Sequence, residues 1–298
     1  MARNKRWGAK YEDNRNWKEY NKHLIKRGEF YIDPAFLETW HIDLISMNDN
    51  KVGQPYKYPN SLIEYLAVLK GKGFDYRALE GILHVLSRLF GPFPVISYSQ
   101  IRRRILALPI SFSQSSSSRT MGVDGSGIKV TNRGEWMRQK WGIRRGWIKA
   151  VILGDAEGNV RDIRIGNDKF DERSAGRRMI CKNHKNMDKM LMDGLHDVND
   201  TFDLCEKYDL ETGINVRKNA SPKGLNRRAR EVRLYQKLGY KDWASHKQYG
   251  TRWPATEGIF SAVKRIFGEC VSSYRDQNMY RETLLKFWAY QKLKGLGT

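Results

Sequence analysis

The chain has 298 residues, which is enough for a substantial hydrophobic core and for two domains. Its 54 lysines and arginines against 33 aspartates and glutamates give a net charge of +21, which favours a polyanionic partner, most often nucleic acid. A ribosomal protein, a membrane-surface protein and a merely basic surface are the alternatives. Three cysteines without CxxC spacing, no long apolar run and no secretory signal argue against a secreted or membrane protein, so we expect a soluble, cytoplasmic one.

The N-terminal third is expected to be helical. Residues 1–30 combine Lys, Arg and Asn with scattered aromatic residues and predict a basic arm or a peripheral helix. Residues 31–110 then show the apolar period of helices. One helix is expected in PNSLIEYLAVLKGKG, ended by Gly71 and Gly73, and Asp75 is the expected N-cap of the next one.

A third helix in this region carries a group of arginines. In SYSQIRRRILALP, Ser97 and Gln100 have the spacing of a capping box, and Arg102, Arg103 and Arg104 lie largely on the outward face. A capped helix with three arginines, placed after a helix and a turn, suggests a reader of DNA similar to a helix-turn-helix. An ordinary helical domain with a solvated arginine face is the alternative, and the turn is longer than that motif usually has.

A serine-rich linker, 111–119, separates the helical pattern from an alternating one. MGVDGSGIKV, WIKAVILGD and NVRDIRIGN each predict a strand, with DAEGN as the hairpin turn between the second and third. A helix-compatible stretch over 171–189, a strand in KMLMDG, a helix around 199–207 and a strand in GINVRK follow. This order predicts an α/β fold, a mixed sheet flanked by helices.

Three carboxylates occupy notable places in this arrangement. Asp124 lies inside the first strand, Asp193 ends the fourth, and Glu257 shares a polar helical stripe with Ser261 and Lys264. Each acid by itself is more often a turn, cap or surface residue. If the first and fourth strands are neighbours, however, the two aspartates meet, and a glutamate on a helix beside the sheet can join them.

Three convergent carboxylates suit the binding of two Mg²⁺ ions, because Mg²⁺ prefers oxygen ligands and completes its shell with water and substrate phosphates. Paired ions about 4 Å apart can activate the attacking oxygen and stabilise the leaving oxygen in a displacement at phosphorus. Mn²⁺ is expected to substitute. A metal ligand would explain why a carboxylate stands in the middle of a strand.

Two further motifs contain residue types that are typical of binding sites. TNRGEWMRQKWGIRRGWIK, residues 131–149, interleaves cations with tryptophans, which fits either a loop that follows DNA or the core of a hairpin with a solvated rim. CKNH contains Cys181 and His184 but has no second half with suitable spacing, so a zinc site is not expected. Glu135, Asp155 and Asp197 are rival carboxylates, of which we assign Asp155 to a hairpin turn and Asp197 to a helix cap or turn.

Several of these segments resemble one family. VDGSGIKV is similar to a first-aspartate strand, DGLHDVND with GINVRKNA to a second-aspartate region, and YGTRWPATEGIFSAVKRIFGE to a glutamate helix with a Tyr-Arg-Glu-Lys signature. WHIDLISMNDNKVGQPYKYPNSLIEYL through YSQIRRRI resembles the helical leader of the same group. The chain thus resembles DDE transposases of insertion sequences, of the superfamily of insertion sequences four and five.

The resemblance implies an RNase H-like catalytic domain over 120–298 with a basic insertion around 220–250, preceded by a helical DNA-binding domain over 31–110. It implies that Asp124, Asp193 and Glu257 are the catalytic, metal-binding triad. The signature's DNA contacts would be Tyr249, Arg252 and Lys264. Arg252 precedes Glu257 by five residues where four are usual. Gly125 stands where Ser or Thr is common, and His196 stands where Tyr is frequent.

The activity implied by this family is DNA transposition. The protein would hydrolyse the phosphodiester at the terminal inverted repeats of its element and join the freed 3′-hydroxyl to target DNA, as a homodimer on DNA in a prokaryotic nucleoid. The carboxylates alone imply only metal-dependent phosphodiester chemistry. A nuclease or resolvase of the same fold without strand transfer, and a repurposed protein that only binds DNA, remain the alternatives.

Overall fold

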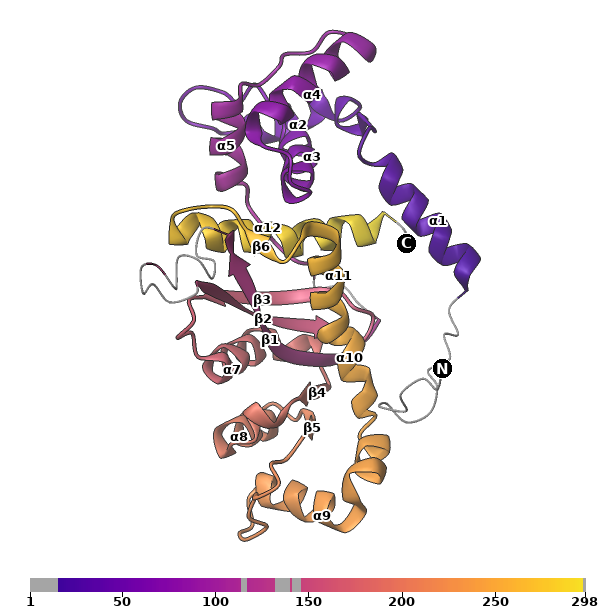
Figure 1. Cartoon of the computed structure of the whole chain (residues 1–298), viewed down its shortest axis with the longest axis vertical. Helices are drawn as coiled ribbons and strands as arrows, with labels where there is room; N and C mark the ends of the chain where they lie inside the picture. The colour runs from indigo at the N-terminus through magenta and orange to yellow at the C-terminus, as the bar shows by residue number, and fades with distance from the viewer. Residues whose placement is uncertain (1–15, 114–116, 132–139, 141–145, 297–298) are drawn as a thin grey trace.

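The computed structural model describes residues 16–113, 117–131, 140 and 146–296. Figure 1 shows a helical region at one end, the helix α12 (Asp276–Gly295) crossing beneath it, and a central sheet with further helices on the far side of α12. The basic arm of residues 1–15 and most of the tryptophan-containing segment lie outside the described residues.

The helical region follows the apolar pattern of its sequence. The Asp75 side chain caps the fourth helix by accepting a hydrogen bond from the Ala78 amide at 2.8 Å, and Gly71 ends the third helix, as predicted. Ser97 is the N-cap of the fifth helix, but its side chain makes no capping hydrogen bond, so the predicted capping box is wrong. The Ser97 hydroxyl lies 3.3 Å from the Ser99 hydroxyl instead. The helices are α1 (Trp17–Glu29), α2 (Trp40–Asn48), α3 (Asn60–Gly71), α4 (Tyr76–Leu89) and α5 (Tyr98–Ala107).

Within the described residues the sheet has six strands, in the order β3-β2-β1-β4-β5, with β6 paired to the other end of β1. β1, β2 and β3 are antiparallel, and β4 and β5 run parallel to β1, which agrees with the RNase H-like arrangement. The first and fourth strands are therefore neighbours, which meets the condition for Asp124 and Asp193 to lie close together. The fifth strand ends at Ile214, earlier than GINVRK predicted. The strands are β1 (Thr120–Val130), β2 (Trp147–Asp155), β3 (Val160–Gly166), β4 (Lys189–Met192), β5 (Glu211–Ile214) and β6 (Cys270–Val271).

The two faces of the sheet bury different partners because side chains alternate along a strand. Val151 and Leu153 of β2 pack with buried residues of α7 (Glu172–Asn183) and α8 (Asn199–Lys207). Ala150 and Ile152 of the same strand face α11 (Glu257–Phe267) and α12 instead. This second cluster continues into α3, α4 and α5, so the helical region and the sheet share one hydrophobic core. Among the described residues, no helix is long and apolar enough to cross a bilayer.

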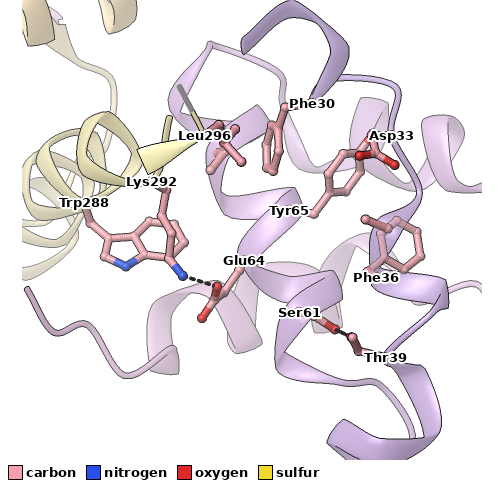
Figure 2. A pocket seen from close by; sticks show the side chains of 12 residues that line it. Phe30, Asp33, Phe36, Thr39, Ser61, Glu64, Tyr65, Trp288, Lys292 and Leu296 are labelled. Carbon is pink, nitrogen blue, oxygen red and sulfur yellow. Dashed lines mark hydrogen bonds and ion pairs between the residues drawn. The ribbon is translucent and has the colours of Figure 1, made fainter. Parts of the chain in front are cut away.

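Contacts with α12 hold the helical region in place. Figure 2 shows the Lys292 ammonium of α12 bonded to the Glu64 carboxylate of α3 at 2.7 Å, beside a pocket of about 310 Å³ lined by Phe30, Tyr65 and Trp288. The Arg281 guanidinium of α12 also donates to the Ile105 carbonyl at the end of α5, at 3.1 Å. These bonds fix α3 and α5 against α12 and hence against the part of the chain that forms the sheet.

The helices near the end of the chain differ from the prediction at one point. A helix beginning at Pro254 was expected, but the backbone breaks at Thr256 (φ −135°, ψ −77°), so that Pro254 lies within the short helix α10 (Arg252–Ala255) and Glu257 begins α11. The break turns the chain so that residues on both sides of it reach the sheet. α9 (Arg227–His246) precedes α10 and is formed by most of the segment around 220–250 that was expected to be a basic insertion.

Candidate active site

Two glycines create the surface on which the glutamate helix sits. Gly122 of β1 pairs with Gly154 of β2 across the sheet. A Cβ atom at Gly154 would lie 2.0 Å from the Ala255 carbonyl oxygen, and one at Gly122 would lie 2.9 Å from the Thr256 methyl group. The absence of side chains at this cross-strand pair therefore lets the α10–α11 junction rest directly on the sheet, which brings Arg252 and Glu257 to Asp124.

A guanidinium joins two of the three predicted catalytic acids. Arg252 donates from one terminal nitrogen to Asp124 Oδ2 at 3.1 Å and from the other to Glu257 Oε1. The Arg252 side chain is 15% exposed and the Asp124 side chain 18%, while that of Glu257 is 48% exposed. Asp124 and Glu257, far apart in sequence, are thus close enough for a single cation to bind both.

Asp193 lies beside this pair. Val123 is in register with Met192 in the parallel β1–β4 pair, so Asp124 and Asp193 are the next residues along two neighbouring strands. The Asp193 carboxylate accepts a hydrogen bond from the Leu195 amide at 3.0 Å. Burial raises the pKa of Asp124, and repulsion from Asp193 adds to this rise, while the Arg252 guanidinium and the Gly125 amide oppose it.

Glu172 is a fourth acid at this end of the sheet, and the sequence analysis missed it. It is the first residue of α7 and is buried, with Lys149 Nζ 3.8 Å from its carboxylate. Burial raises the pKa of Glu172, and repulsion from Asp124 and Asp193 raises it further. A Cβ at Gly125 would lie 2.4 Å from Glu172 Oε2, so the glycine that departs from the family pattern makes room for this carboxylate.

The donor set is chemically suited to a hard divalent cation. Asp124, Asp193, Glu257 and Glu172 offer only carboxylate oxygens, which Mg²⁺ prefers to nitrogen or sulfur. Among the described residues, no group of three or more acidic, histidine or cysteine side chains is already arranged to hold a metal ion. The Arg252 guanidinium lies between Asp124 and Glu257 and neutralises charge that a bound cation would otherwise neutralise.

The other two signature residues are held by protein contacts. The Tyr249 hydroxyl donates to the Met192 carbonyl at 3.0 Å, and its ring packs near Trp243 with centroids 5.2 Å apart. Burial raises the pKa of Tyr249 to about 12. Lys264 Nζ donates to the Ser126 hydroxyl at 2.8 Å, which puts the ammonium on the same face of β1 as Asp124.

The three arginines of α5 differ in their surroundings. Arg102 and Arg103 are exposed. Arg104 is partly buried and donates to the Tyr58 carbonyl at 3.1 Å and to Asn60 Oδ1 at 3.0 Å, so it joins α5 to the start of α3. Burial lowers the pKa of Arg104. Its guanidinium is therefore engaged by the protein, whereas the first two arginines remain accessible.

Glu135 lies outside the described residues, and the other two rival carboxylates have structural roles. Asp155 accepts hydrogen bonds from the Asn159 amide at 2.9 Å and from Arg161 Nε at 2.8 Å, which closes the β2–β3 hairpin. Asp197 does not cap α8, contrary to one of the roles expected for it, because Val198 is the N-cap. Asp197 is instead buried and paired with the Arg228 guanidinium at 2.6 Å.

Two histidines near these elements take part in packing. His184 stacks on the Tyr208 ring at 4.0 Å between centroids. His196, at the position where the family often has Tyr, is fully buried beneath the site, and burial lowers its pKa. A Cβ at Gly176 would lie 2.8 Å from the His196 ring, so the histidine fills the space above α7.

Two family models, both described as "Transposase DDE domain", match the chain. One covers residues 25–133 and the other covers residues 116–291, which is more than half of the sequence. The second match spans all three predicted catalytic acids and the elements that position them.

Solved structures of Mos1 transposase show a weaker likeness. The Mos1 transposase catalytic domain with Raltegravir and Mg is 11% identical, with a TM-score of 0.25 over 67% of this chain and 89% of that one. A Mos1 paired-end complex with the left transposon end is 11% identical, with a TM-score of 0.25 over 83% of this chain and 81% of that one. The site assignment therefore depends on the family models and on the geometry described above.

Proposed function

The chain belongs to the family of transposases with a DDE domain and is a DNA transposase, and we propose that Asp124, Asp193 and Glu257 are its catalytic acids. The observation that carries the proposal is that the Arg252 guanidinium bridges the Asp124 and Glu257 carboxylates beside Asp193. A guanidinium in this place indicates a site with surplus negative charge that is built to receive cations.

The proposed cofactor is a pair of Mg²⁺ ions, for which Mn²⁺ can substitute. When bound, they would supply the charge stabilisation that an in-line displacement at phosphorus needs. Asp124, Asp193 and Glu257 would hold them from three elements that the sheet keeps rigid, and Glu172 adds a fourth carboxylate close to Asp124.

The cationic signature residues then act on DNA. Lys264, held 2.8 Å from the Ser126 hydroxyl, is positioned to bind a phosphate next to the carboxylates. Arg252 can exchange its two carboxylate partners for a phosphate, which a guanidinium can bind through two parallel hydrogen bonds. Tyr249 helps to position Arg252, whose guanidinium lies 5.6 Å from the centre of the Tyr249 ring.

We further propose that the substrates are the terminal inverted repeats of the element and a target duplex, and that two copies of the chain act together on DNA. Residues 31–110 would contribute DNA contacts through the exposed Arg102 and Arg103, while Arg104 holds α5 in position. Residues 120–298 would form the catalytic part, with the serine-rich segment 111–119 joining the two.

The test separates catalysis from binding and cleavage from joining. Asp124→Asn is expected to abolish the Mg²⁺-dependent cleavage of a terminal repeat and also the joining of a pre-cut end, with end binding retained. The matched control is Asp188→Asn, which changes an exposed carboxylate paired with Arg119. Asp188 lies just before β4, whereas the site residue Asp193 lies just after it. Cleavage that persists in Asp124→Asn would contradict the assignment of this acid. A wild-type protein that cleaves but never joins would identify a nuclease instead.

A further inference from the structure

A second cationic site lies where the helical region meets the catalytic half. A surface pocket of about 530 Å³ is lined by residues of α3, α4, α5 and the loop before α12. We call it the seam pocket, and its main lining residues are Lys70, Tyr76, Arg102, Ser272, Tyr274 and Arg275. A pocket of this size is large enough for a nucleotide-sized group.

Three cations converge on the seam pocket from three separate elements. Lys70 lies in the last turn of α3, Arg102 on the exposed side of α5, and Arg275 directly before α12. Within the part of the chain that the structure describes, none of the three forms an ion pair with a carboxylate. None of the described residues that line the pocket is acidic, and the Glu282 carboxylate of α12 accepts hydrogen bonds from the backbone amides of Ser272 and Ser273 at 2.9–3.2 Å. The positive charge of the pocket is therefore not neutralised from within.

The pocket is also held rigid from below. Arg281 of α12 donates to the Ile105 and Leu108 carbonyls at the end of α5, and Glu282 fixes the Ser272–Ser273 loop to the same helix. The Tyr76 ring lies under Lys70, with the ammonium 5.3 Å from the ring centre. The cations are thus presented on a fixed frame, and little ordering would be needed when they bind a ligand.

We propose that the seam pocket binds the sugar–phosphate backbone of duplex DNA. Clustered cations that are not paired with carboxylates are suited to bind the phosphates of a duplex. Contacts to the DNA backbone fix the register of a protein on the duplex without reading its sequence. The Tyr274 side chain, 81% exposed at the rim, adds a surface for sugar contact. This inference rests on the proposed function, because it assigns part of the DNA path to Lys70 and Arg275, which no sequence motif indicated.

The test is the salt dependence of DNA binding by the full chain. The triple variant Lys70→Gln, Arg102→Gln and Arg275→Gln is expected to make the negative slope of log K against log salt shallower by roughly 2.7, since each lost phosphate contact removes about 0.9 from its magnitude. Affinity should fall equally for terminal-repeat duplex and for unrelated duplex. The matched control, Arg178→Gln, Lys185→Gln and Lys207→Gln, removes the same charge from exposed positions around α7 and α8 and should leave the slope almost unchanged.

Two outcomes would overturn the inference: a wild-type slope in the triple variant, or an equal fall in the control. Fluorescence anisotropy with labelled duplexes at several KCl concentrations measures the slope, and thermal unfolding verifies that all variants are folded. The single variants, each expected to reduce the magnitude of the slope by about 0.9, keep the test decisive if the triple variant is unstable. A wild-type protein that binds no DNA would contradict the proposed function itself, which is a different result.

Discussion

Cationic side chains occupy two regions of this molecule in opposite states. At the carboxylate end of the sheet, Arg252 is bonded to Asp124 and Glu257. In the seam pocket, Lys70 and Arg275 face solvent without an acid partner among the described residues. A cation with an internal counter-ion stabilises the protein and attracts DNA weakly, whereas an unpaired cation adds its full charge to the field that DNA meets. The same residue types therefore serve two different purposes.

The largest effect should separate the chemistry of the two regions. Glu257→Gln is expected to lower the rate of end cleavage by about 10³-fold or more, because a metal site supplies several kcal/mol of charge stabilisation and each 1.4 kcal/mol is tenfold in rate. The seam-pocket triple variant, assayed in single turnover at saturating protein, should cleave at the wild-type rate.

The control for Glu257→Gln is Glu269→Gln. It changes an exposed glutamate just after α11 that forms an ion pair with Lys129. If Glu257→Gln cleaved normally, or if the seam-pocket variant stayed slow when fully bound, the functional distinction between the two regions would be wrong.

A smaller effect concerns stability. In the absence of divalent cation, Arg252→Gln leaves Asp124 without its counter-charge. It is expected to reduce the free energy of unfolding by about 1–2 kcal/mol. This value is at the low end for a broken ion pair because Glu257 is half exposed. Mg²⁺ should restore part of this loss, since it binds only the folded site. Urea denaturation with and without Mg²⁺ measures both quantities.

Arg275→Gln and Arg265→Gln serve as comparisons, because both remove an exposed arginine without a carboxylate partner in the described structure. Neither should change stability by more than about 0.5 kcal/mol. If Arg275→Gln reduced the free energy of unfolding as much as Arg252→Gln, the proposed difference between paired and unpaired cations would be wrong.

The smallest expected effect is a change in the pH dependence of stability that Glu172 contributes at the carboxylate site. The pKa of Glu172 is raised in the folded protein, so the metal-free folded state holds its proton to higher pH than the unfolded chain does. The stability contributed by this proton is present below the ordinary pKa of the group and is lost as pH rises through the raised value. Glu172→Gln should therefore flatten the decline in metal-free stability as pH rises above the ordinary glutamate range.

The measurement for Glu172 is the free energy of unfolding across a pH series in the presence of chelator. Glu206→Gln, which alters an exposed acid paired with Arg230, should leave the pH profile unchanged. An unaltered profile in Glu172→Gln would contradict a raised pKa of Glu172 in the folded, metal-free protein.

The sequence by itself determined the elements and most of their order. Apolar periodicity is a local property, so it located the first three strands, the Asp75 cap and the helix Asn199–Lys207, and a carboxylate inside a strand drew attention to Asp124. Predictions that depended on finer detail were less accurate: the capping box at Ser97 does not form, and the glutamate helix begins at Glu257 and not at Pro254.

Only the tertiary structure decided what those elements bring together. The Gly122–Gly154 pair gives access to the sheet because the missing Cβ atoms leave room for the α10–α11 junction, and no local pattern encodes that fit. Glu172 and the seam pocket were overlooked for the same reason: their partners lie far away along the chain. Periodicity describes how a segment folds, whereas the charge balance of a site depends on which distant side chains the packed core places next to it.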